Sequence, residues 1–322
     1  MVLTVQSTYH STTKRQLSRN NSLAKVDKSQ YTKEEWRIVR EERRRQKEYD
    51  RAQKALSKLK KQKDTERTVK VAVNEPLAVQ PQSQHTDRKN FIVCLKHGSK
   101  YGPEYVNTLY NMTRRHCTIP HEFVCFTDDK RGLYPEIHTI DLKQIGVYGW
   151  WYKPMFFDKN LPLNGNILYF DLDIVICKNI DNLFTYNPDL FCICRDFNRS
   201  LRHDWNRMNS SVFRLTTGSL PFVYDTFMEN PAMNMRRFHG DQDWIYECLV
   251  SHRHLWTFWP DEWIRSYKWE MRDRSDLERI SGSRNFRNKA QPKVLPKTNV
   301  AVFHGEPHPH QVEDDWVKEN WI

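Results

Sequence analysis

Residues 167–176 read ILYFDLDIVI, an apolar run interrupted by two aspartates, Asp171 and Asp173. The run is typical of a strand that is buried on both faces of a sheet. The two carboxylates close this strand one residue apart, where they can share a single hard cation. Such a cation, Mn²⁺ or Mg²⁺, keeps coordination positions open for the phosphates of a substrate.

Short apolar segments of the same kind lie on both sides of this run and alternate with helix-like segments. We predict further strands at 91–95, 121–129, 137–142, 189–196 and 209–215, and a helix at 103–116. This alternation predicts an α/β domain with a mixed, mainly parallel sheet flanked by helices. Ligands of such sheets bind beyond the carboxyl ends of the strands, where Asp128, Asp129, Asp171 and Asp173 are expected.

Nearly all of the net positive charge lies in the first quarter of the chain. Residues 1–88 hold 21 Lys and Arg against 11 Asp and Glu, whereas the other 234 residues hold 30 against 29. We predict disorder for 1–31, a basic charged helix for 32–65, a linker for 66–88 and the α/β domain for 89–322. The helix is most simply a solvated helix, and a weak coiled coil is an alternative. Residues 1–88 are also a candidate for binding a polyanion or an acidic partner.

Composition argues against a membrane span and against zinc. No apolar run reaches about 18 residues, so no transmembrane segment is predicted, and the first ten residues lack a signal-peptide pattern. Cys192 and Cys194 alternate along a predicted strand instead of forming a zinc-binding pair. We expect reduced, buried thiols in a cytoplasmic protein.

Seven segments follow one another in the order seen in glycosyltransferases of the GT-A fold. They are KYGPEYVNTLYNMTRRH (100–116), FVCFTDD (123–129), GWWYKP (149–154), ILYFDLDIVI (167–176), WNRMNSSVF (205–213), HGDQDW (239–244) and VAVFHGEPHPH (300–310). Residues 91–312 thus resemble the glycogenin and galactosyltransferase-like branch and its bacterial and phage homologues. The resemblance implies a GT-A-like, Rossmann-like fold that moves a sugar from a nucleotide diphosphate sugar to an acceptor hydroxyl.

The resemblance also implies roles for particular residues. Asp171, Asp173 and His304 are the expected metal ligands, since Mn²⁺ accepts imidazole beside carboxylates. Asp241, Gln242 and Asp243 are expected to orient hydroxyls and to stabilise positive charge at the reacting sugar, although Gly240-Asp241 is also a good helix start. The expected donor-binding residues are Lys96, Tyr101, Asp128, Lys153, Asn209, Ser210, Ser211, Gly305 and His308.

The chain departs from the family pattern after Gly305. The family usually has a lysine in this segment that helps to neutralise the leaving diphosphate, whereas this chain reads EPHP at 306–309. His308 can donate a hydrogen bond but is only partly charged at neutral pH. Another cation, such as Lys96 or Lys153, is the alternative.

Two other functions are compatible with the same residues. A strand followed by DxD also opens phosphatases of the haloacid dehalogenase type, but there it is the first strand, whereas about 80 residues of strand and helix precede Asp171 here. A phosphatase or nucleotidyltransferase would release phosphate or pyrophosphate instead of a nucleoside diphosphate. A catalytically degenerate domain that serves as an interaction module is the non-enzymatic alternative.

Overall fold

The computed structural model describes residues 88–202, 204–272, 277–279, 286–288 and 291–322. They belong to one compact unit, Gln84–Ile322. The predicted disordered segment, the basic helix and nearly all of the linker lie outside the described residues, so these assignments stay predictions.

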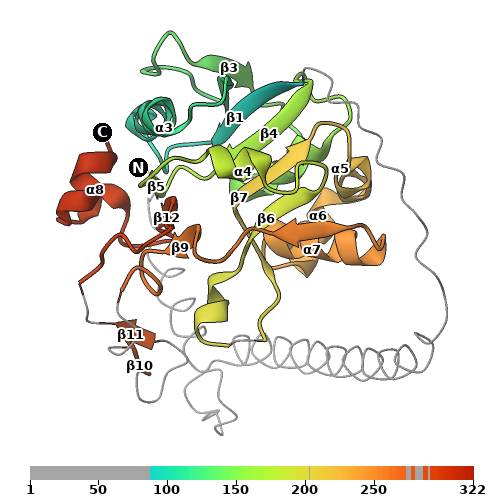
Figure 1. The fold of residues 1–322 in the computed structure, drawn as a ribbon. Helices are drawn as coiled ribbons and strands as arrows, with labels where there is room; N and C mark the ends of the chain where they lie inside the picture. Colours follow the sequence, from blue (N-terminus) through green and yellow to red (C-terminus); the bar gives the residue numbers. More distant parts are fainter. Residues whose placement is uncertain (1–87, 203, 273–276, 280–285, 289–290) are drawn as a thin grey trace, which may run out of the picture. The chain divides into compact units, whose positions relative to one another are not determined.

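A seven-stranded sheet forms the centre of this unit, with the strand order β3-β2-β1-β4-β7-β6-β8 (Figure 1). Neighbouring strands are parallel except that β7 runs antiparallel to β4 and to β6. The predicted mixed, mainly parallel sheet is therefore confirmed. The strands are β1 (Lys89–Lys96), β2 (Glu122–Thr127), β3 (His138–Asp141), β4 (Gly165–Phe170), β6 (Phe191–Arg195), β7 (Met208–Thr216) and β8 (Trp256–Phe258).

The central strands are apolar throughout because successive side chains enter two different apolar layers. In β1, Ile92 and Cys94 belong to one layer, and Phe91 and Val93 belong to the other. The first layer is closed by helix α3 (Pro103–His116). The second is closed by the 3-10 helix η2 (Gly149–Phe157) and the helices α5 (Pro221–Glu229) and α7 (Asp241–Ser251).

Residues 167–176, whose apolar pattern is continuous, do not form a single strand. They form parts of two strands that are separated at the aspartates. Strand β4 ends at Phe170, and β5 (Ile174–Ile176) joins a separate three-stranded sheet of order β5-β12-β9. The other two strands are β12 (Val300–Val302) and β9 (Ile264–Ser266). Because β12 runs antiparallel to β5, its end lies beside the aspartates, and the amide of Phe303 donates to the backbone oxygen of Asp173 at 2.9 Å.

The remaining elements are short. They are α4 (Asp181–Thr185), η3 (Phe197–Ser200), α6 (Pro231–Arg237), the antiparallel pair β10 (Leu277–Arg279) and β11 (Phe286–Asn288), η5 (Pro309–Gln311) and α8 (Asp315–Asn320). None of the described helices has the length and apolar character needed to span a bilayer. The seven cysteines are free thiols, and six of them are buried.

Candidate functional site

The carboxyl ends of three neighbouring parallel strands meet at one edge of the large sheet. Strand β1 pairs with β2 up to Lys96 and Thr127, and its other neighbour is β4. Beyond these ends, the amide of Gly98 donates to both oxygens of Asp128 at 3.2 and 3.0 Å, and Lys96 Nζ donates to the backbone oxygen of Asp129 at 3.2 Å. Lys96 and Asp128 therefore lie at the strand ends, as the sequence predicted.

The carboxylate of Asp171 contacts side chains of both strand β4 and helix η2. Tyr169 precedes it by two residues, so both side chains point to the same face, and the Tyr169 hydroxyl donates to Asp171 Oδ1 at 2.8 Å. Lys153 Nζ lies 2.8 Å from the same oxygen. Burial alone would lower the pKa of Lys153, but Asp171 and Asp241 outweigh it and raise this pKa. The ammonium group is thus charged and fixed.

Lys153 also connects strand β7 with the start of helix α7. Its Nζ donates to Ser210 Oγ at 3.1 Å and to the Ser210 backbone oxygen at 3.2 Å, and it lies 3.8 Å from Asp241 Oδ2. Asp241 is 4% exposed, and burial raises its pKa while Lys153 opposes the shift. Asp241 Oδ2 has no hydrogen-bond partner within the described part of the chain. Buried polar atoms are rarely left in this state, and the charge of Lys153 nearby is what compensates this oxygen.

The other polar residues predicted on β7 and α7 adjoin this group. Asn209 accepts from the amide of Ser211 at 3.1 Å and donates to Gln242 Oε1 at 3.4 Å. Asp243 is half-buried, and burial raises its pKa against the opposing charges of Arg207 and His239. Helix α7 begins at Asp241 with Gly240 as its N-cap, so the helix start predicted there is confirmed.

Asp173 lies two residues after Asp171 and is 8% exposed. The hydroxyl of Tyr101 donates to Asp173 Oδ2 at 3.0 Å. Burial and the negative charge of Asp171 raise the pKa of Asp173 to about 6. A divalent cation relieves this kind of cost, because it neutralises two desolvated acids together. The carboxylate pair therefore fits a hard cation.

His304 follows β12, and its ring is held by neighbours of its own. The ring stacks on Phe197 with centroids 5.1 Å apart, and its Nε2 shares a 2.7 Å hydrogen bond with Ser266 Oγ. Burial and Lys268 lower the pKa of His304 to about 4, so the imidazole is neutral at pH 7, the form that binds metals. Over the described ranges, no three or more His, Cys, Asp or Glu side chains are gathered as a metal site. His304 as third ligand thus stays a prediction.

Three residues at this site were missed by the sequence analysis: Tyr169, Ser266 and Lys268. Tyr169 could have been found, because the two-residue period of a strand places it on the same face as Asp171. Ser266 and Lys268 reach His304 through the pairing of β9 with β12, about 36 residues apart in the chain. No local pattern in the sequence predicts such a pairing.

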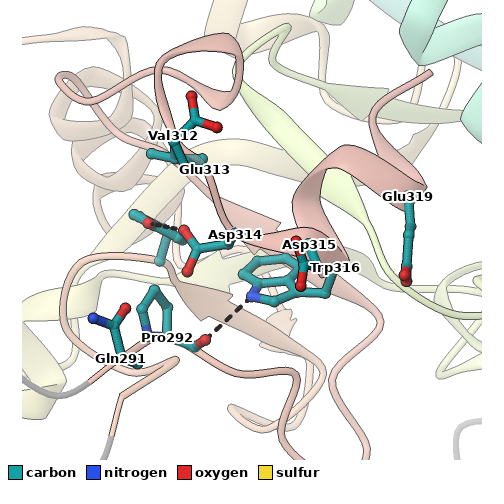
Figure 2. Close-up of a pocket in the computed structure, with 9 residues that line it drawn as sticks. Gln291, Pro292, Val312, Glu313, Asp314, Asp315, Trp316 and Glu319 are labelled. Atoms are coloured by element: carbon teal, nitrogen blue, oxygen red, sulfur yellow. Dashed lines mark hydrogen bonds between the residues drawn. The ribbon is translucent and has the colours of Figure 1, made fainter.

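An open cavity of about 690 Å³ lies elsewhere, beside helix α8 (Figure 2). It carries four carboxylates and contains none of the predicted site residues. Two hydrogen bonds join lining residues to one another: Tyr267 donates to Asp314, and Trp316 donates to the Pro292 backbone. The lining residues are Tyr267, Gln291, Pro292, Val312, Glu313, Asp314, Asp315, Trp316 and Glu319.

Comparison with known proteins finds similarity among solved structures. No family model and no curated protein matches the chain. The chain is similar to the apo form of the glycosyltransferase GlyE of Streptococcus pneumoniae TIGR4, with 12% identity and a TM-score of 0.49 over 72% of this chain and 61% of GlyE. It is also similar to an active-site mutant of LgtC, with 10% identity and a TM-score of 0.45 over 68% and 89% of the two chains.

A second LgtC structure, the galactosyltransferase in complex with donor and acceptor sugar analogues, has 10% identity and a TM-score of 0.42 over 68% of this chain and 88% of LgtC. These structural similarities all have low sequence identity and TM-scores below 0.5.

Proposed function

We propose that this chain is a metal-dependent glycosyltransferase that moves a sugar from a nucleotide diphosphate sugar to an acceptor hydroxyl. One observation carries the proposal: Lys153 lies between Asp171 and Asp241, with all three side chains largely removed from water, at the edge where the parallel strands end. Parallel sheets bind their ligands at this edge. A buried cation between two acids holds both carboxylates in place, one for a metal ion and one for sugar hydroxyls.

The metal would be held by Asp171 and Asp173, with His304 as the third ligand. When bound, Mn²⁺ or Mg²⁺ neutralises the charge of the diphosphate. Lys153 fixes the orientation of Asp171 through its 2.8 Å contact, and Tyr101 does the same for Asp173. These two contacts would hold the carboxylates in place for a cation.

The donor sugar would lie against β7 and the start of α7. Asp241 would accept from a sugar hydroxyl, and the linked amides of Asn209 and Gln242 would fix other hydroxyls. Ser210, Ser211 and Asp243 complete this side. Lys96, Tyr101 and Asp128 would face the nucleotide, and Gly305 and His308 the diphosphate.

In the reaction, the bond between the sugar carbon and the diphosphate oxygen breaks, and its electron pair stays on the diphosphate. The acceptor oxygen forms the new bond to the same carbon and releases its proton to water. Asp241 and Asp243 provide negative charge where the sugar carbon becomes positive, which lowers the barrier electrostatically.

The test replaces one carboxylate of the predicted metal pair. Wild-type protein with Mn²⁺ and a panel of nucleotide diphosphate sugars should release a nucleoside diphosphate slowly, with water as acceptor. Asp173→Asn should reduce this rate by about 10²-fold or more, because the cation is lost from the transition state. Asp225→Asn, on the exposed surface of α5, is the matched control and should keep the wild-type rate.

Unchanged turnover in Asp173→Asn would contradict the mechanism. The product separates the other candidates: phosphate or pyrophosphate would indicate a phosphatase or nucleotidyltransferase that uses the same acids. No turnover and no binding of any sugar nucleotide would favour an interaction module.

A further inference from the structure

Lys268 lies at the turn that follows strand β12, although it is remote from it in sequence. The parallel pairing of β9 with β12 aligns Ser266 with Val302, so residues two positions further along, 268 and 304, come to lie opposite each other. Lys268 Nζ donates to the backbone oxygen of His304 at 2.8 Å. It also lies 3.5 Å from the position that a Cβ on Gly305 would occupy.

The ammonium group of Lys268 is half-buried without an ion pair. Among the described residues, no carboxylate lies within ion-pair distance of Lys268, and the group that accepts its hydrogen bond is a neutral carbonyl. Asp173 and Glu306 attract the Lys268 ammonium only from beyond ion-pair distance. A partly desolvated charge of this kind is costly unless an anion compensates it.

The cations that the sequence suggested for this place are engaged or neutral. Lys153 is paired with Asp171 and Asp241, and Lys96 donates to the backbone of Asp129 on the far side of β1. Burial and the charge of Lys100 lower the pKa of His308, so its ring is mostly neutral at pH 7. Among the described residues, Lys268 thus lies next to Gly305 and has no ion pair.

The backbone at this turn leaves space for an anion. Gly305 has φ +77°, a left-handed conformation that other residues adopt only with strain. Without a side chain at this position, a ligand can approach both the backbone and Lys268 Nζ. Asp173, which attracts Lys268, belongs to the predicted metal pair, so cation and ammonium would face the same ligand.

We propose that Lys268 binds the diphosphate group of the sugar nucleotide at the His304–Gly305 turn, in place of the lysine that the 306–309 segment lacks. This role rests on the proposed function, because it presupposes a nucleotide diphosphate as donor. In that role Lys268 holds the two phosphates and stabilises the negative charge that develops on them as the sugar leaves.

The experiment measures binding, so it does not depend on turnover. UDP, GDP, ADP, CDP and dTDP are titrated into wild-type protein with Mn²⁺ by calorimetry, together with the corresponding nucleosides. Lys268→Gln can still donate to the His304 carbonyl but has no charge. It should bind the preferred diphosphate about tenfold more weakly, the effect of one charge-assisted hydrogen bond, with no change for the nucleoside.

Lys268→Arg should restore most of the affinity because it keeps the charge. Lys297→Met is the matched control, since Lys297 is an exposed lysine that pairs with Glu262 at 3.6 Å. Melting curves identify any variant that fails to fold, and Lys268→Met is the second neutral variant in that case. Wild-type affinity in a folded neutral variant would overturn this role of Lys268 alone. Failure of the wild type to bind any diphosphate would overturn the proposed function, and this role with it.

Discussion

The buried position of Asp173 lowers the stability of the folded chain but suits the binding of a ligand cation. It is almost fully buried, its neighbour Asp171 carries the same charge, and the Tyr101 hydroxyl compensates only one of its oxygens. Functional sites often carry such a cost, which binding then relieves.

This cost predicts a pH-dependent gain in stability for Asp173→Asn in metal-free buffer. The pKa of Asp173 is raised to about 6 in the folded protein, above about 3.9 in an unfolded chain, so its ionisation destabilises the fold. The cost is absent below about pH 4 and complete above about pH 6. The asparagine variant should therefore melt at a higher temperature than wild type near pH 7.5, and the difference should shrink near pH 4.5. An equal difference at both pH values would show that Asp173 does not titrate in this range.

Residues of the site could be predicted from the sequence where they follow a strand or belong to a recognisable motif. Asp171, Lys153, Ser210 and Asp241 came from segments far apart in sequence, and the structure brings them together around one ammonium group. Lys268 was not predictable, because its position depends on how β9 pairs with β12 and on nothing in its own neighbourhood.

At the scale of elements, apolar runs bounded by polar residues predicted β1, β2, β4 and helix α3 well. Local pattern could not predict the antiparallel direction of β7 or the change of sheet between β4 and β5, because both are set by which strands become neighbours. Helix η2 was not predicted either. It contains Pro154 and five aromatic residues, and its burial between the sheet and α5 stabilises its conformation.

Strand β7 carries a buried arginine, Arg214, whose side chain stabilises the connection from α4 to β6. Its guanidinium donates to the backbone oxygens of Leu183, Phe184, Tyr186, Asn187 and Leu190. Arg214→Met leaves these buried carbonyls without donors and should lower the free energy of unfolding by about 3 kcal/mol or more in urea denaturation. Arg236→Met, on the exposed surface of α6, should cost less than about 0.5 kcal/mol. Equal losses for the two variants would contradict a bracing role for Arg214.

At the scale of the whole molecule, positive charge is unevenly distributed along the chain. The net positive charge lies in residues 1–88, and the remaining residues are close to neutral. We predict that the full chain binds a polyanion such as heparin, that this binding weakens with salt, and that it disappears when residues 1–88 are deleted. The truncated protein should keep its melting temperature and its affinity for sugar nucleotides, because the described unit has its own core. Retention of polyanion binding by the truncated protein would place the binding surface in the α/β domain.

The central claim is that Asp171 and Asp173 bind a nucleotide diphosphate sugar through a shared divalent cation. The most direct measurement is calorimetric titration of the chain with a panel of nucleotide diphosphate sugars, with Mn²⁺ and with chelator, for wild type and Asp173→Asn. We predict that wild type binds at least one of them, that chelator weakens this binding by about tenfold or more, and that the variant binds equally weakly with and without Mn²⁺. Binding by wild type that is unaffected by chelator, or an Asp173→Asn variant that responds to Mn²⁺ as wild type does, would contradict the claim.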